Sequence, residues 1–167
     1  MHAPSGIRLR PPSAADGAAL HELVRRSPPL DLNSVYAYLL QGLHLADTCV
    51  VAETDSGLAG YVSAYLPPRT PDTLFVWQVA VAAAQRGRGL GLRMLQHLLA
   101  RPGCAGVRWL ETTVTPGNAA SRRLFEKFAA DQGCACRVSR LFTAASFGSP
   151  SHEEEELYRI GPLPRSG

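Results

Sequence analysis

The stretch TLFVWQVAVAAAQRGRGLG, residues 73–91, decides the fold. Residues 73–82 are apolar almost throughout, which predicts a strand buried on both faces at the centre of a sheet. Residues 86–91 contain three glycines and lead into an apolar stripe with helical spacing. A buried strand, a glycine-rich turn and a helix in this order indicate an α/β protein.

The other elements are predicted from hydrophobic periodicity and from proline and glycine breaks. Their order predicts a mixed α/β sheet of about six or seven strands flanked by about four helices, in a single domain over residues 1–167 with an ordered core of about 6–161. The expected helices run from 13 up to the prolines at 28–29, from 31 or 33 to about 42, from about 90 up to 102–103, and over 119–130. The expected strands are residues 7–10, 48–53, 58–66, 73–82, 107–114, 137–142 and 156–160.

The composition indicates a globular chain without a membrane span. The 167 residues are 46% hydrophobic and 19% charged, a balance typical of a packed domain. The longest apolar run, around residues 79–84, is too short to cross a bilayer. Arg8 and Arg10 lie where a secretory signal would be apolar. We therefore expect no export signal, no membrane partner and a cytoplasmic protein.

Charge and cysteine content argue against nucleic acid and metal. All the basic residues except Lys127 are arginines, and this Arg- and Ala-rich composition indicates codon bias rather than nucleic-acid binding. The four cysteines lack the spacing of zinc ligands, so we expect reduced structural thiols and no metal. The basic residues concentrate between 86 and 140, where they would attract an anionic ligand.

The glycine-rich loop at residues 86–91 is the strongest motif. Its glycines leave backbone N–H groups free to wrap a phosphate oxygen, and Arg86 and Arg88 add positive charge. The loop has neither the ending nor the glycine spacing of the two commoner phosphate loops. The alternative is a tight turn with solvated arginines.

The residues Arg86-x-x-Gly89-x-Gly91, after the strand residues Val79-Ala80-Val81, resemble the acetyl-CoA signature of the GCN5-related N-acetyltransferases. Asn118, followed by an Ala-rich helix, resembles the second cofactor motif of that superfamily. The resemblance implies a sheet splayed at its centre, with acetyl-CoA as co-substrate. It also implies that the pantetheine arm pairs with the central strand and touches Asn118. The implied cofactor-binding residues are Val79, Val81, Arg86, Gly87, Arg88, Gly89, Gly91 and Asn118.

Four longer strings are similar to the diaminobutyrate acetyltransferases of ectoine biosynthesis: PLDLNSVYAY (29–38), PDTLFVWQVAV (71–81), LETTVTP (110–116) and HEEEELYRI (152–160). This resemblance implies acetyl transfer from acetyl-CoA to the 4-amino group of L-2,4-diaminobutyrate. The product, N4-acetyl-L-2,4-diaminobutyrate, is the precursor of ectoine, a solute that bacteria accumulate under osmotic stress. Similar enzymes are often homodimers, so we expect a homodimer.

A diamino acid carries two ammonium groups, so its site needs acidic side chains. Asp31 follows a proline pair at a helix start, where it is either an amine ligand or the N-cap, and Asn33 could cap in its place. Trp77 is predicted to line the substrate pocket and cover an ammonium group, the alternative being core packing.

The acidic run near the C-terminus supplies further candidates. Period-two alternation would place Glu153 and Glu155 on one side of a strand, and these two are predicted to bind the amine. The alternative for such a run is a solvated face, which we keep for Glu154 and Glu156.

The reaction needs a neutral amine, and an alkyl ammonium with a pKa near 10 is only about one part in a thousand neutral at pH 7. A glutamate or histidine acting through one water, or desolvation of the amine, would remove the proton. Backbone N–H groups near Val79 could polarise the thioester carbonyl. The candidate catalytic residues are Trp77, Glu111, His152 and Tyr38, although a carboxylate at Glu111 could equally be structural with a charged partner.

One position departs from the superfamily pattern. Many members place a tyrosine on the helix after the asparagine to protonate the leaving thiolate, and the matching residue here is Phe125. The proton would come from Tyr38, His152 or solvent, or CoA would leave as the thiolate. Two other functions stay open: acetylation of a different amine, such as a polyamine or a peptide N-terminus, and a non-catalytic acyl-CoA-binding module.

Overall fold

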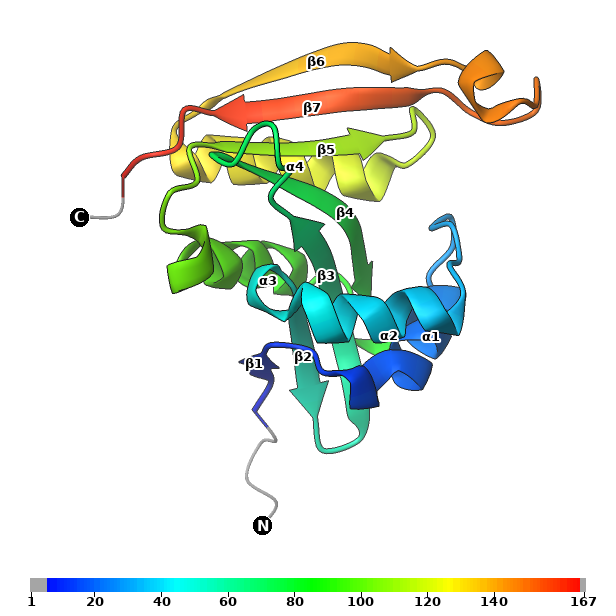
Figure 1. The fold of residues 1–167 in the computed structure, drawn as a ribbon, viewed down its shortest axis with the longest axis vertical. Coiled ribbons are helices and arrows are strands. Elements are labelled where there is room, and N and C mark those ends of the chain that lie inside the picture. The colour runs from blue at the N-terminus through cyan, green and yellow to red at the C-terminus, as the bar shows by residue number, and fades with distance from the viewer. Residues whose placement is uncertain (1–5, 166–167) are drawn as a thin grey trace. The chain divides into compact units, whose positions relative to one another are not determined.

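The computed structural model describes residues 6–165. Within them, seven strands form one mixed sheet in the order β1-β2-β3-β4-β5-β7-β6, accompanied by four α-helices (Figure 1). The fold class predicted from the sequence is confirmed. The helices are α1 (Gly17–Arg25), α2 (Val35–His44), α3 (Leu90–Leu99) and α4 (Ala119–Gln132), and the strands are β1 (Arg8–Arg10), β2 (Val50–Thr54), β3 (Gly57–Tyr65), β4 (Thr73–Val81), β5 (Trp109–Val114), β6 (Ala135–Phe142) and β7 (Glu155–Gly161).

The chain divides into two compact units, which are described separately. The first contains Met1–Tyr65 and Gln78–Ala105, and the second contains Leu66–Trp77 and Gly106–Gly167. The prediction of a single domain with an ordered core of about 6–161 stays a prediction. Residues 1–5 and 166–167 belong to the predicted domain, and residues 1–5 also belong to the N-terminal stretch in which no export signal is expected. They lie outside the described residues.

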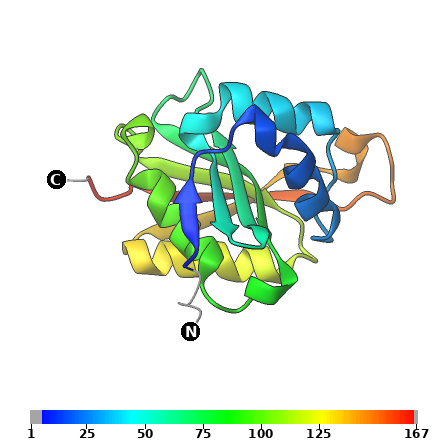
Figure 2. The ribbon, with the colours of Figure 1, turned by 90° about the horizontal axis from the view of Figure 1, so that it is seen from below.

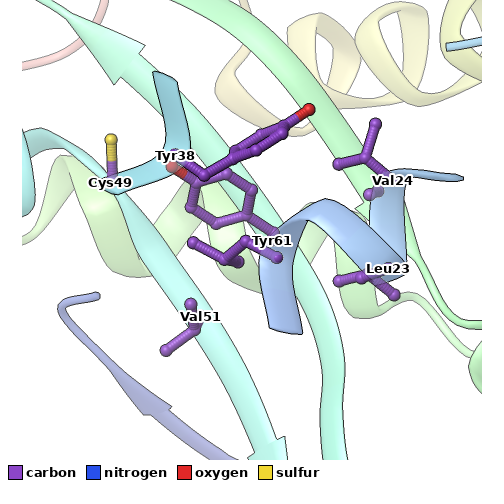
Figure 3. Close-up of a cluster of buried hydrophobic side chains, with 8 residues drawn as sticks. Leu23, Val24, Tyr38, Cys49, Val51 and Tyr61 are labelled. Atoms are coloured by element: carbon purple, nitrogen blue, oxygen red, sulfur yellow. The ribbon is translucent and has the colours of Figure 1, made fainter. Parts of the chain in front are cut away.

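In the first unit, different helices cover the two faces of the β2–β3 hairpin. Tyr61 of β3 belongs to a buried cluster with α1 and α2, whereas a Cβ on the preceding Gly60 would lie 2.9 Å from the methyl carbon of Met94 on α3. Figure 2 shows α1 and α2 on one side of the hairpin and α3 on the other. The apolar stripes of these helices account for this arrangement, because each stripe leaves water on contact with the hairpin. The cluster in Figure 3 comprises Leu20, Leu23, Val24, Tyr38, Cys49, Val51, Tyr61 and Ala80.

In the second unit, β7 lies between β5 and β6 and pairs antiparallel with both. Helix α4 packs on β6 and β7 and buries Phe125 and Phe128 (Figure 1). Gly133, with a φ of 65°, ends α4 in the left-handed conformation, as its position in the sequence predicted. Strand β6 is the last of the sheet and is largely exposed.

The parallel pairing of β4 with β5 is short. It runs from Thr73 with Trp109 to Val76 with Thr112, although β4 continues to Val81 and β5 to Val114. The hydroxyl of Thr112 donates a hydrogen bond to the carbonyl oxygen of Val76 at this last pair. The main-chain groups of β4 beyond Val76 are therefore not used in this ladder.

Three local predictions were wrong. The N-cap of α2 is Ser34, whose hydroxyl accepts from the N–H of Ala37, and not Asp31 or Asn33. Strand β4 is not buried on both faces, since Trp77 is 43% exposed. The alternation proposed for the acidic run does not reach Glu153, because β7 begins only at Glu155.

Candidate functional site

The loop before α3 has the geometry of an anion site. Gly87 and Gly89 have φ values of 74° and 75°, which L side chains rarely adopt, and a Cβ on either would meet nothing within 4 Å. Gly89 is the N-cap of α3 and carries no side chain, so the first N–H groups of the helix have no side-chain cap. Open space above two glycines, at the positive end of a helix dipole, fits a phosphate group.

The two arginines of this loop differ in their contacts. Arg86 and Arg88 are both exposed, but of the two only Arg86 has a main-chain contact in residues 6–165: its Nε donates to the carbonyl oxygen of Val81 at 3.1 Å. Arg86 therefore ties the loop back to the end of β4. Gly91 is buried in the first turn of α3. Its lack of a side chain therefore allows close packing of the helix and adds no open space to the loop.

Alternation along β4 divides its side chains between two environments. Val76, Gln78 and Ala80 are buried. Trp77, Val79 and Val81, on the other face, are all partly accessible. The two predicted cofactor residues of β4 thus share a face with the predicted substrate residue Trp77.

Asn118 is the N-cap of α4. Its Oδ1 accepts a hydrogen bond of 3.1 Å from the N–H of Ser121, which leaves the side-chain NH₂ group as its available donor. Phe125 is 2% exposed in the same helix, so it provides packing and no proton.

Asp31 and Tyr38 are brought together through a residue that the sequence analysis did not select. The amide nitrogen of Gln78 donates to the carbonyl oxygen of Asp31 at 2.6 Å, and the Tyr38 hydroxyl donates to Oε1 of Gln78 at 3.1 Å. Tyr38 has no exposed surface, and burial raises the pKa of its hydroxyl. The Asp31 side chain is exposed and, within residues 6–165, has no hydrogen bond or ion pair.

Glu111 has a cationic partner. Arg159, its cross-strand neighbour on β7, donates to Oε1 of Glu111 and stacks 4.0 Å from the ring centre of Trp109. The structure thus supplies the charged partner that a structural glutamate needs at this place. Arg159 was missed because the pairing depends on the register of β5 with β7, which the sequence pattern does not specify.

His152 lies in the loop between β6 and β7, stacked on Phe147 at 3.7 Å between ring centres. Its Nδ1 is 2.7 Å from the carbonyl oxygen of Glu153. A carbonyl only accepts, so this contact assigns the proton to Nδ1 and, in the neutral ring, leaves the lone pair on Nε2. The tautomer suits a base that acts through Nε2.

The acidic residues after His152 do not behave alike. A carboxylate oxygen of Glu153 lies 2.9 Å from where a Cβ on Gly117 would be, so Glu153 reaches over the turn before α4. Glu154 pairs with Arg140 at 3.0 Å. Glu155 begins β7 opposite Phe142 and is half-buried.

The described residues contain no cluster of three or more His, Cys, Asp or Glu side chains that could hold a metal ion. The cysteines are free thiols, and burial raises the pKa of Cys104 to about 11. No helix in residues 6–165 is both long and apolar enough to span a membrane.

The sequence pattern of the Acetyltransferase (GNAT) family matches residues 18–130. The chain belongs to this family. An L-2,4-diaminobutyric acid acetyltransferase of Bordetella parapertussis is 55% identical over 156 residues, covering 93% of this chain and 84% of the relative. An enzyme of the same name from Streptomyces avermitilis is 47% identical over 165 residues, covering 98% and 92%.

Two solved structures are similar to this chain. A diaminobutyrate acetyltransferase EctA from Paenibacillus lautus, in complex with its substrate L-2,4-diaminobutyric acid and coenzyme A, superposes with a TM-score of 0.91 at 42% identity, covering 98% of this chain and 99% of that one. The ribosomal-protein-S18-alanine N-acetyltransferase from Escherichia coli reaches a TM-score of 0.71 at 17% identity, over 97% of each chain, which shows the fold alone. The family resemblance predicted from residues 29–38, 71–81, 110–116 and 152–160 is confirmed.

Proposed function

We propose that this GNAT protein transfers the acetyl group of acetyl-CoA to the 4-amino group of L-2,4-diaminobutyrate, giving N4-acetyl-L-2,4-diaminobutyrate. One observation carries the proposal: relatives named for this reaction are 55% and 47% identical over more than nine-tenths of the chain. We extend it to a role in ectoine biosynthesis and osmoprotection, to a cytoplasmic location and to a homodimer.

The loop before α3 fits the diphosphate of CoA. Gly87 and Gly89 leave room for phosphate oxygens at the start of α3, and Arg88 supplies an exposed positive charge. Val79 and Val81 lie in the part of β4 beyond its ladder with β5, and the main-chain groups on that edge are proposed to pair with the pantetheine amides. The carbonyl oxygen of Val81 would do so while it accepts from Nε of Arg86. When bound, acetyl-CoA supplies the activated acyl group.

The predicted amine ligands remain Asp31, Trp77, Glu153 and Glu155. The Asp31 carboxylate is exposed and has no partner among residues 6–165, so it can bind an ammonium group without first breaking an ion pair there. The exposed indole of Trp77 can cover a cationic head group. These two features support recognition of a diamine more directly than the acidic run does.

The reaction requires two proton transfers, one from the amine of the substrate and one to the thiolate of CoA. His152, with its lone pair on Nε2, is the candidate base for the amine proton, acting directly or through water. Glu111 also remains a predicted base, but its carboxylate would have to accept the proton while it is paired with Arg159. Attack of the neutral amine on the thioester carbonyl forms the C–N bond, and collapse breaks the C–S bond without a covalent enzyme intermediate. The thiolate proton is predicted to come from Tyr38, His152 or solvent, since Phe125 has none to give.

Release of CoA thiol from acetyl-CoA tests the proposal, with L-2,4-diaminobutyrate as substrate and ornithine, lysine and spermidine as competing amines. We expect strong preference for diaminobutyrate and, by mass spectrometry, acetylation at the 4-amino group. Turnover with spermidine alone would discard the substrate and keep the fold and cofactor. Binding of acetyl-CoA without turnover of any amine would favour the non-catalytic binding module.

A further inference from the structure

A partly buried ring of three hydrogen bonds holds the segment that carries Asp31. The Asn33 N–H donates to the Tyr38 hydroxyl at 3.5 Å, that hydroxyl donates to Gln78 Oε1 at 3.1 Å, and Gln78 Nε2 donates to the Asp31 carbonyl oxygen at 2.6 Å. Tyr38 and Gln78 are 0% and 5% exposed. Two side chains of the core therefore clamp the backbone on either side of Leu32.

The directions of these hydrogen bonds are determined by chemistry. The Asp31 carbonyl oxygen can only accept, so Gln78 must turn its NH₂ group toward it. The amide oxygen of Gln78 then faces Tyr38 and can only accept the hydroxyl proton. Because Tyr38 has one proton and Gln78 already takes it, Tyr38 is better suited to hold the segment than to protonate a leaving group.

Gln78 is itself fixed at its main chain. Its N–H donates to the buried hydroxyl of Ser63 on β3 at 3.1 Å. The clamp therefore connects the Asp31 segment to the central strand β4, one residue beyond Trp77 and one before Val79. The position of Asp31, which lies in a loop, is thus fixed by hydrogen bonds to a strand residue. A carboxylate that binds a ligand needs such a fixed position.

We infer that Gln78 and Tyr38 are positioning residues for the amine substrate, holding Asp31 so that its free carboxylate takes an ammonium group of the diamino acid. The inference rests on the proposed function, because it assigns Asp31 to the amine. It accounts for a glutamine in the otherwise apolar run of β4. It also accounts for the N-cap of α2 at Ser34, which leaves Asp31 free of capping.

The chain offers a matched control in Tyr61. Its ring packs edge-on against Tyr38 at 6.4 Å between ring centres, it is equally buried, and its hydroxyl donates to Gln41 Oε1 at 2.6 Å. Figure 3 shows the two hydroxyls diverging to different sides of the cluster. Tyr61→Phe and Gln41→Met thus remove a comparable buried hydrogen bond from the same cluster without touching the Asp31 segment.

The experiment measures kcat/KM for L-2,4-diaminobutyrate and KM for acetyl-CoA in Tyr38→Phe and Gln78→Met, in the two control variants, and in the Asp31→Asn background. We expect Tyr38→Phe and Gln78→Met to lower kcat/KM for the amine by about fivefold to tenfold, the size expected for a lost hydrogen bond. KM for acetyl-CoA should stay within about twofold, and both controls should match wild type within the same margin. In Asp31→Asn, adding Tyr38→Phe should change kcat/KM by less than about twofold, because the carboxylate that the clamp positions is gone.

Equal losses in Tyr38→Phe and Tyr61→Phe would mean that the cluster only contributes stability, and would overturn the inference. An undiminished effect of Tyr38→Phe in the Asp31→Asn background would overturn it as well, since the hydroxyl would then act independently of Asp31. A wild-type protein that does not acetylate diaminobutyrate would instead overturn the proposed function. The two failures are therefore distinguishable.

Discussion

The Thr112 hydroxyl donates a hydrogen bond of 2.9 Å to the carbonyl oxygen of Val76, at the pair where the ladder between β5 and β4 ends. Val76 is 1% exposed and Thr112 is 3% exposed, so an unpaired Val76 carbonyl would have little access to water. A side-chain donor at the last rung of a short parallel ladder stabilises the point beyond which the two strands no longer pair.

Thr112→Val should therefore lower the free energy of unfolding by about 1 kcal/mol, because it keeps the shape and removes the donor. Urea unfolding followed by circular dichroism measures the change. Thr113→Val is the matched control, since Thr113 is the next residue of β5 and, in residues 6–165, its hydroxyl has no hydrogen bond. Equal effects of the two substitutions would show that the Val76 contact contributes nothing.

Gly89→Glu should raise KM for acetyl-CoA more than about tenfold, because a carboxylate at the start of α3 would repel a diphosphate. Any side chain there is also strained by the φ of 75°. Gly89→Gln carries the same strain without the charge, and the excess effect of Glu over Gln should shrink as salt is raised. Identical KM values for the Glu and Gln variants would contradict an anion site at this loop.

Trp77→Ala should lower kcat/KM for diaminobutyrate by about tenfold while KM for acetyl-CoA is kept, since loss of a cation–π contact costs about 1 kcal/mol or more. Val138→Ala, which removes a side chain of comparable exposure, at 49%, from β6, is the control and should resemble wild type. A Trp77→Ala protein with weakened acetyl-CoA binding and unchanged amine use would assign the indole to the cofactor.

The sequence predicted those features that depend on local chemistry. The end of α4 at Gly133 was predicted correctly because a left-handed helix end depends on a single residue. The glycine-rich turn between β4 and α3 was also placed correctly, and Gly87 and Gly89 there have positive φ, whereas its binding of phosphate stays a prediction. The N-cap of α2 was missed because three residues that can cap, Asp31, Asn33 and Ser34, follow each other closely.

Features that depend on distant pairing could not be predicted. The partnership of Glu111 with Arg159 follows from the β5–β7 register, and 48 residues separate the two. The sequence pattern gave Gln78 no functional role, because it stands in an apolar run. Its side-chain amide nevertheless donates a hydrogen bond to the backbone carbonyl of a residue 47 positions earlier. The useful signal was its burial: a polar side chain at an inward position of a central strand needs a partner.

Asp16 should make the stability of the first unit depend on acid. Its carboxylate accepts hydrogen bonds from both terminal nitrogens of Arg10, at 2.9 and 2.8 Å, and from the Ser13 N–H at 2.7 Å. The bonds from Arg10 are the largest cause that lowers the pKa of Asp16 below its ordinary 3.8, against burial, which raises it. A depressed pKa in the folded state means that the stabilisation is complete above about pH 4 and is lost as pH falls through the folded pKa.

Asp16→Asn should consequently lower the free energy of unfolding at pH 7 by about 1 to 3 kcal/mol, because it leaves the Arg10 guanidinium without its main partner. The difference from wild type should narrow below about pH 4, where the Asp16 carboxylate of the unfolded wild-type chain takes up a proton before that of the folded protein does. Asp55→Asn is the matched control, because Asp55 lies at the exposed turn between β2 and β3 and its side chain has no hydrogen bond or ion pair within residues 6–165; it should keep the wild-type free energy of unfolding at pH 7. Urea unfolding of all three proteins between pH 7 and pH 3 tests this, and a gap between Asp16→Asn and wild type that stays constant with pH would show that the charge of Asp16 is not what stabilises the fold.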